Sequence, residues 1–142
     1  MKAALEEARK AYKLGEVPIG AVLVKDREII VRDHNLRERA KDPLGHAEIR
    51  VIATAAKKLN NWRLDNTTLY VTLEPCPMCA GAIINSRISR VVFGALDPKA
   101  GAAGTVVNVL ENSQFNHRVE VISGIMEDEC KEIIQHFFKN LR

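Results

Sequence analysis

Four side chains of this 142-residue chain have the types and the spacing that metal-assisted chemistry requires. Cys76 and Cys79 form a C-x-x-C pair in the segment "EPCPMCAGA", and His46 and Glu48 stand in the segment "GHAEI". A C-x-x-C pair is typical of a metal site or of a redox-active dithiol. A histidine and a glutamate at a helix start are more often solvated, so they gain a function only if the cysteines lie beside them in the fold.

Both segments stand where a helix is expected to begin. Pro75 predicts the start of the second of these helices, with Cys76 and Cys79 in its first turn, where free N–H groups and the helix dipole stabilise thiolates. If the strand connections are right-handed, both helix starts lie at the carboxyl ends of the strands, where open α/β sheets hold their sites. The sequence therefore predicts that His46 and the two cysteines lie close together.

Two thiolates and one neutral imidazole are a donor set that suits Zn²⁺. Three protein ligands leave the fourth tetrahedral position to water, as in catalytic rather than structural zinc sites. We therefore expect His46, Cys76 and Cys79 to bind one zinc ion. Glu48, two positions from a ligand, is expected to move protons to and from the water at the open position.

The elements that must position these residues alternate between helix and strand. Helices are expected at residues 1–15, 47–59, 76–87 and 126–141, and strands at residues 19–25, 28–32, 67–73, 90–95 and 119–123. The strands at residues 19–25 and 28–32 are expected to form a hairpin. This order predicts an α/β fold, a three-layer α/β/α sandwich with a central mixed five-stranded sheet, in a single domain of residues 1–142. The buried faces expected for the second and last helices are Ile49, Ile52, Ala53, Ala56 and Leu59, and Cys130, Ile133, Ile134, Phe137 and Leu141.

Composition and charge favour a soluble, cytoplasmic protein. The N-terminal segment carries acidic residues and resembles neither a signal nor a transit peptide, and no apolar run is long enough to cross a membrane. The net charge of +3 and the pI of about 8.8 permit a nucleic-acid partner without requiring one. Basic residues gather only in "RDHNLRERAK" and in the terminal "KNLR".

The two motifs together resemble the H-x-E and P-C-x-x-C signature of zinc-dependent nucleobase deaminases. Further segments, "EVPIGAVLV", "DPLGHAEI", "TLYVTLEPCPMCAGAIINSRISRVVFGA", "DPKAGAAGT" and "NHRVEV", are similar to the bacterial tRNA-specific adenosine deaminases. This resemblance covers nearly the whole chain. It implies a cytidine deaminase-like fold, one Zn²⁺ per subunit, a homodimer, and conversion of the wobble adenosine in a tRNA anticodon stem-loop to inosine.

The resemblance also implies residues that hold the substrate. Asn35 would contact the adenosine, the Ala47 N–H would face a ring nitrogen, and Ile19 would form an apolar wall against the base. Residues expected to contact the sugar, the backbone or neighbouring nucleotides are Asp97, Lys99, His117 and Phe138, with Phe137 and Lys139 in the same region. Leu96 stands where an arginine or another polar residue is common in the family, so this chain departs from the family at one position beside Asp97.

Three other functions fit parts of the sequence. A free nucleobase or nucleoside deaminase, acting on guanine, cytidine or deoxycytidylate, would share the zinc site and Glu48 but would not need the basic loop before His46. A structural zinc module would need a fourth ligand, and Cys130 is the remaining cysteine, which we interpret as a core thiol. A redox protein would use the C-x-x-C pair without zinc.

Overall fold

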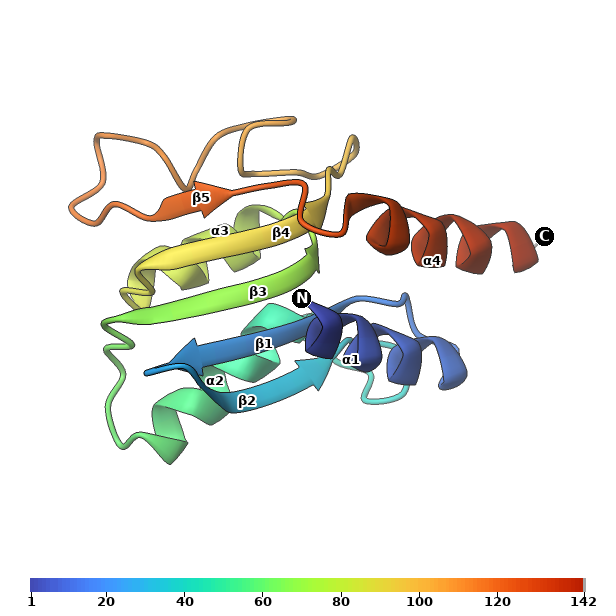
Figure 1. Cartoon of the computed structure of the whole chain (residues 1–142), viewed down its shortest axis with the longest axis horizontal. Coiled ribbons are helices and arrows are strands. Elements are labelled where there is room, and N and C mark those ends of the chain that lie inside the picture. The colour runs from blue at the N-terminus through green and yellow to red at the C-terminus, as the bar shows by residue number, and fades with distance from the viewer. Residues whose placement is uncertain (142) are drawn as a thin grey trace.

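The computed structural model describes residues 1–141 as one mixed sheet with helices on both faces (Figure 1). Arg142, which ends the basic segment "KNLR", lies outside the described residues. No helix within residues 1–141 is both long enough and apolar enough to span a membrane. The elements, in chain order, are α1 (Lys2–Lys13), β1 (Gly20–Lys25), β2 (Glu28–His34), α2 (Ala47–Lys58), β3 (Thr67–Leu73), α3 (Pro77–Asn85), β4 (Arg90–Ala95), β5 (Glu120–Ile122) and α4 (Glu127–Asn140).

The sheet has the strand order β2-β1-β3-β4-β5. β1 pairs antiparallel with both β2 and β3, whereas β3, β4 and β5 pair in parallel. Asp26 and Arg27 turn the chain between β1 and β2 with φ values of 52° and 64°, the positive values that a tight two-residue hairpin turn requires. The expected mixed sheet of five strands, with an antiparallel hairpin at one edge, is confirmed.

Helices cover both faces of the sheet, as the three-layer prediction requires. α1 packs on β1 and β2 and α4 packs on β4 at one face, while α2 and α3 lie together against the other (Figure 1). The larger apolar cluster joins α2 and α3 to the sheet through residues such as Val51, Ile83 and Leu69. A smaller cluster at the opposite face contains Leu5 and Cys130, so Cys130 is a buried core thiol, as expected.

The buried face of α2 differs from the expected one. Its fully buried apolar residues are Ala47, Val51 and Ala55, which follow one another at intervals of four and form one stripe. Ala53 is exposed, and Ile52 is only partly buried at the edge of the core. The predicted face was right in part, because Ile52 and Leu59 pack against the edge of the core. Its centre was misplaced, because the small Ala47 and Ala55 beside Val51 let α2 approach the sheet closely.

The last helix is covered by the core over only part of its length. Cys130 and Phe137 are buried, but Leu141 is 65% exposed, which corrects the expectation that it belongs to the buried face. Figure 1 shows the physical reason. α4 runs past the end of the sheet, so its final turn has no sheet residues to pack against.

Candidate metal and catalytic centre

The starts of α2 and α3 lie at the same edge of the sheet. β2 and β3 both pair antiparallel with β1, so they run in the same direction and end at that edge. After β2 the chain enters α2 through His46, and after β3 it enters α3 through Cys76; each is the N-cap residue of its helix. The fold therefore brings together two segments that are far apart in the sequence.

The side chains of His46, Cys76 and Cys79 form a compact set of donor atoms. His46 Nδ1 lies 3.6 Å from Cys76 Sγ and 3.5 Å from Cys79 Sγ, and the three atoms lie within 4.8 Å of one another. Tetrahedral zinc bonds of about 2.1 Å to nitrogen and about 2.3 Å to sulfur would separate these atoms by about 3.6 Å. Among residues 1–141 no further His, Cys, Asp or Glu joins this group, which is the ligand number of a catalytic rather than a structural site.

The start of α3 corrects one detail of the sequence analysis. Pro77, not Pro75, stands in the first turn of the helix, and Cys76 precedes it with an extended backbone of φ −75° and ψ 172°. Proline suits the first helical position because its missing N–H would have no partner there. Cys76 therefore caps the helix and Cys79 lies in its first turn, so the helix N-terminus still favours thiolates at both positions.

The two thiols differ in their affinity for a proton. The hydrogen bond from the Cys79 thiol lowers the pKa of Cys76 to about 4; burial opposes this shift, and the contact with His46 adds to it. The same hydrogen bond, together with burial, raises the pKa of Cys79. Zinc binds cysteine as the thiolate, so metal binding would release any proton that either sulfur holds.

Glu48 lies in the first turn of α2, beside the donor set, and is only 4% exposed. Burial raises the pKa of its carboxyl group to about 7, while a hydrogen bond with the Cys79 thiol opposes that shift. A group with a pKa near the working pH can both accept and release a proton, which general acid–base catalysis requires. The structure thus places Glu48 where the sequence analysis expected a proton-transfer group.

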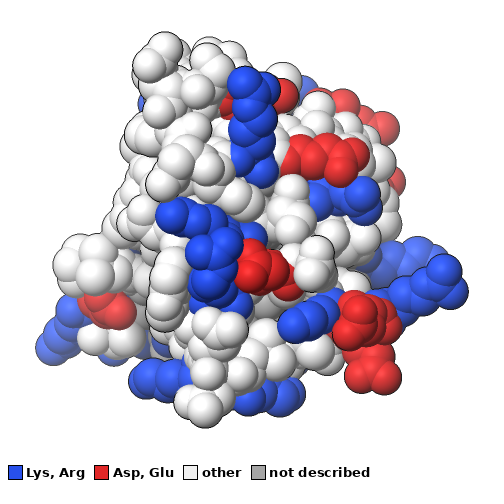
Figure 2. Space-filling model, turned by 90° about the vertical axis from the view of Figure 1, so that its left-hand side faces the viewer, with Lys and Arg blue, Asp and Glu red and all other residues white. Residues whose placement is uncertain are grey.

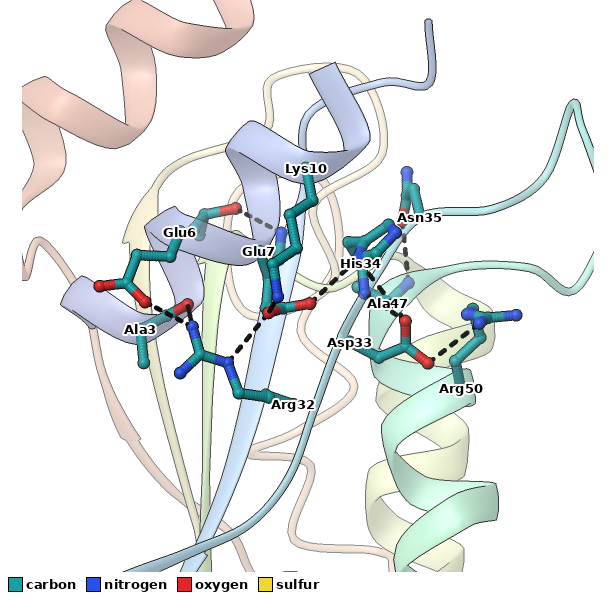
Figure 3. Close-up of polar contacts among 12 residues, drawn as sticks. Ala3, Glu6, Glu7, Lys10, Arg32, Asp33, His34, Asn35, Ala47 and Arg50 are labelled. Atoms are coloured by element: carbon teal, nitrogen blue, oxygen red, sulfur yellow. Dashed lines mark hydrogen bonds and ion pairs between the residues drawn. The ribbon is translucent and has the colours of Figure 1, made fainter. Parts of the chain in front are cut away.

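Three of the expected substrate-binding residues, Ile19, Asn35 and Ala47, are linked by hydrogen bonds. Asn35 Oδ1 accepts a bond of 2.8 Å from the Ala47 N–H (Figure 3). The Asn35 N–H in turn donates to the Ile19 carbonyl oxygen at 3.1 Å. The Ala47 N–H, which we expected to face a ring nitrogen of the base, is bonded to Asn35, and this bond holds the start of α2 against the end of β2.

Asp97 and Lys99 lie in the loop that follows β4. Asp97 Oδ1 accepts hydrogen bonds from the N–H groups of Lys99 and Ala100, so its carboxylate caps its own loop. The Lys99 side chain is exposed. The Ala102 N–H donates to the Pro75 carbonyl oxygen at 2.8 Å. The loop is therefore held against the residue that directly precedes Cys76.

Two buried glutamates that the sequence analysis missed anchor loops near this edge. Glu16, 1% exposed, accepts hydrogen bonds from the three N–H groups of residues 37–39. Burial alone would raise the pKa of Glu16, but these bonds lower it below its ordinary value. Glu74, 2% exposed, binds the loop after β4 in the same manner. Neither has a sequence signal, because a lone glutamate resembles a surface residue.

His117 and Phe138 are the residues expected to hold neighbouring nucleotides. Neither joins the residues described above at the starts of α2 and α3. His117 Nε2 donates to the Ile88 carbonyl oxygen at 2.8 Å, just before β4 begins. The strands extend about 20 Å from that end of the sheet to the metal centre. The structure therefore does not bring His117 to the site. Phe138 is 46% exposed on α4, and its ring contacts that of Phe137 edge-on with centroids 5.3 Å apart.

The end of the molecule remote from the metal centre carries both signs of charge. Figure 2 shows Lys and Arg side chains interspersed with Asp and Glu side chains on this face. Two ion pairs belong to it, Arg90 with Glu120 at 3.0 Å and Arg63 with Asp65 at 3.1 Å. This face has no continuous basic surface, in agreement with the absence of a basic block in the sequence.

A buried ionic network ties α1 to the strand that leads to Asn35. Glu7 accepts hydrogen bonds from Lys10 Nζ at 2.6 Å, from Arg32 Nε at 2.9 Å and from His34 Nδ1 at 2.9 Å (Figure 3). Burial alone would raise the pKa of Glu7, but these three bonds together lower it to about 2. The charged carboxylate therefore stabilises the fold and fixes the end of β2.

Glu7→Gln should lower the free energy of unfolding at pH 7 by about 2 kcal/mol, because it leaves hydrogen-bonded cations without their buried partner. The folded-state pKa is depressed, so the stabilisation is present above the ordinary value of 4.5 and is lost as the pH falls from there toward about 2. Urea unfolding at pH 7, 5 and 3 measures the difference between variant and wild type, which should shrink at pH 3.

Glu6→Gln is the matched control for this experiment. Glu6 is bonded to the same guanidinium, with Arg32 Nη2 at 2.6 Å, but its side chain is 59% exposed. An exposed ion pair contributes about 1 kcal/mol or less, so this variant should be nearly neutral. Equal losses in the two variants, or a loss in Glu7→Gln that does not change with pH, would contradict the assignment.

Comparisons with known proteins show which family this chain resembles. A family model described as MafB19-like deaminase matches residues 1–142. The tRNA-specific adenosine deaminase of Bacillus subtilis (strain 168) is 57% identical over 142 residues, covering 100% of this chain and 88% of the relative. The tRNA-specific adenosine deaminase of Aquifex aeolicus (strain VF5) is 47% identical, covering 100% of this chain and 93% of the relative.

A solved structure of a tRNA deaminase is similar to this chain as well. A chain from structural studies of A-to-I editing by tRNA:A34 deaminases at the wobble position superposes with a TM-score of 0.90 at 47% identity, over 94% of this chain and 96% of that chain. These similarities extend over almost all of both proteins, so they include the sheet, the segments that carry His46, Cys76 and Cys79, and the loop after β4. The chain belongs to the family of tRNA-specific adenosine deaminases.

Proposed function

We propose that this protein hydrolytically deaminates the wobble adenosine of a tRNA anticodon loop to inosine. The observation that carries the proposal is the convergence of His46, Cys76 and Cys79 beside the buried Glu48, in a chain that resembles tRNA-specific adenosine deaminases over its full length. An anticodon loop is single-stranded, so one base can leave its stack at a small cost in free energy. A tRNA substrate also fits a cytoplasmic location.

Zinc is the metal that best fits the donor set, with one ion per subunit. Its ligands would be His46 Nδ1 and the Sγ atoms of Cys76 and Cys79, whose spacing supports tetrahedral coordination. When bound, zinc supplies a water whose pKa is lowered to near 7. The protein's part is to hold the ion at the starts of two helices and to present Glu48 beside it.

Glu48 would move the protons of the reaction. Its carboxylate accepts a proton from the water that attacks C6 of adenine and delivers that proton to N1, which makes C6 more electrophilic. The carboxylate, free again, then takes the remaining proton from the hydroxyl group on C6 and passes it to the amino group, so that the C–N bond breaks, ammonia leaves and C6 becomes the carbonyl carbon of inosine. Burial, which raises the pKa of Glu48 to about 7, supports both the accepting and the donating role.

The base would lie between Ile19 and the start of α2. Ile19 is partly buried against the main core and can supply an apolar wall. Asn35 uses its Oδ1 to hold the Ala47 N–H, which leaves its Nδ2 to donate to an acceptor of the purine. In this arrangement Ala47 acts through Asn35 and not by a direct contact with the base.

Contacts with the RNA around the base would come from three neighbouring elements. Lys99 is exposed on the loop after β4, and Asp97 shapes that loop. Arg37 and Arg39 lie on the loop that Glu16 anchors, where they can meet phosphates. Phe138 has an exposed ring that can stack on a base. His117 would contact RNA only at a distance from the metal centre.

We also propose that the enzyme is a homodimer. Partly exposed apolar residues line the outer side of the packed helices α2 and α3, namely Ile49, Ile52, Ala56, Met78 and Ala82. The small residues among them allow a second copy to approach closely, and a C2 pair would bury the same strip on both subunits. Sedimentation at micromolar concentration should give twice the monomer mass, and a monomer there would count against the proposal.

The function is tested by incubating the protein with an anticodon stem-loop that carries a wobble adenosine, followed by nucleoside analysis. Inosine should form in this RNA, and no reaction should occur with free adenosine, cytidine, deoxycytidylate or guanine. Guanine is a pertinent control, because a guanine deaminase from Bacillus subtilis superposes with a TM-score of 0.66 at 40% identity, over 73% of this chain and 67% of that chain. Deamination of a free compound alone would favour that second class of reaction.

A further inference from the structure

The buried Glu74 connects the metal-binding segment to the loop after β4. We propose that Glu74 is a positioning residue whose carboxylate holds residues 97–105 in the shape that binds the RNA substrate. The inference deepens the proposed function and rests on it. Glu74 is not part of the donor set of His46, Cys76 and Cys79, so its effect should be seen in substrate binding rather than in the chemical step.

The carboxylate of Glu74 is bonded at both oxygens. Oε1 accepts hydrogen bonds from the Asp97 N–H at 3.1 Å and from the Thr105 hydroxyl. Oε2 accepts from the Ala103 N–H at 2.9 Å and from the Thr105 N–H at 3.2 Å. These donors span the loop from its first turn to its last, and all of them meet one side chain that is 2% exposed. A single buried carboxylate therefore fixes both ends of the loop.

Gly101 shows how closely the loop approaches this carboxylate. A Cβ atom built at Gly101 would overlap the Glu74 carboxyl group, so no larger residue fits there without moving the loop. The Gly101 N–H also donates to the Asp97 carbonyl oxygen at 3.0 Å. The loop is thus wrapped around the side chain of Glu74, and the glycine is needed for that close packing.

Glu74 and the loop that it holds lie between the segment that carries Cys76 and an exposed surface. Glu74 stands two positions before Cys76, and the next residue, Pro75, accepts the Ala102 N–H at 2.8 Å. The loop and its flanks expose Lys99, Leu96 and Val106. A cation beside apolar side chains suits a single-stranded RNA, which offers phosphates and unstacked bases. Shifting the loop would therefore displace RNA contacts and leave the three metal ligands in place.

Glu74→Gln tests the proposal with little change in volume. The amide keeps one acceptor oxygen but turns an NH₂ group toward two N–H donors. Two of the four hydrogen bonds that the side chain accepts from the loop are therefore lost. The KM for the anticodon stem-loop should rise by about 10-fold or more, while kcat changes by less than about 3-fold. Zinc content per chain should stay at the wild-type value. Hydrogen exchange of the loop amides at Ala103 and Thr105 should become at least about 10-fold faster.

Three matched variants separate anchoring from general destabilisation. Gly101→Ala pushes the loop away from the same carboxylate and should also raise KM. Thr105→Val removes the hydroxyl bond alone and should raise KM by less than about 3-fold. Leu64→Ala makes a cavity in the core at the remote end of the sheet and should lower stability without changing KM.

A wild-type KM or unchanged amide exchange in Glu74→Gln would overturn the proposal. So would a loss of zinc together with kcat, because Glu74 would then support the metal site and not the loop. Failure of the wild-type protein to form inosine would instead remove the proposed function, and the exchange measurement would still decide whether Glu74 holds the loop.

Discussion

Glu48→Ala should abolish inosine formation and leave zinc bound at the wild-type ratio. Alanine cannot take a proton from the attacking water or return one to the leaving amino group. A positioned acid–base group typically contributes about 10²–10⁴ in rate, and here one group serves both steps, so we expect a loss of at least about 10³-fold. Single-turnover kinetics with excess enzyme and metal analysis of the same samples measure the two quantities.

Two further variants sharpen this test. Glu48→Gln keeps the shape of the side chain and should be as inactive as the alanine variant, because an amide does not accept a proton near neutral pH. Glu28→Ala removes an exposed glutamate at the hairpin turn, far from the centre, and should retain full activity. Substantial turnover by Glu48→Ala would contradict the assignment of Glu48 as the proton-transfer group. Loss of zinc from the Glu48→Ala variant would show that Glu48 supports the metal site.

Cys79→Ser should remove both zinc and activity. Cys79 is fully buried, and its sulfur lies 3.5 Å from His46 Nδ1, so a serine there replaces a soft ligand in the centre of the donor set. Loss of a hydrogen-bond partner of a ligand typically costs about 10–100-fold in metal affinity or activity, and loss of the ligand itself should cost more than about 100-fold. Metal analysis after dialysis, followed by the inosine assay, tests this.

Cys130→Ser is the matched control for that variant. Cys130 is also fully buried, but it lies in the core cluster at the opposite face of the sheet, so its replacement should lower stability and leave one zinc ion bound. Chelation of wild-type protein should abolish activity, and added Zn²⁺ should restore it. Full activity after complete removal of the metal would contradict the zinc assignment.

Much of the fold follows from local patterns in the chain. The hairpin could be predicted because Asp26 and Arg27 separate two β-branched runs, and the alternation of helices and strands indicated parallel crossovers. The donor set could be predicted as well, since His46 and the cysteines stand at helix starts and such starts share one edge of an α/β sheet. These features depend on interactions between residues close in sequence, or on rules of connection that hold for most α/β proteins.

Other features were decided only by the tertiary structure. The core-facing stripe of α2 is set by how closely alanines let it approach the sheet, and hydropathy alone misplaced its centre. The remote position of His117 depends on where a long loop returns to the sheet. The anchoring roles of Glu16 and Glu74 depend on backbone N–H groups of loops that fold over them. The sequence by itself predicted which residues would bind the metal and move the proton, because short motifs carry them. Long-range packing decided how the surrounding loops are held, because no local pattern records which distant backbone a buried carboxylate will meet.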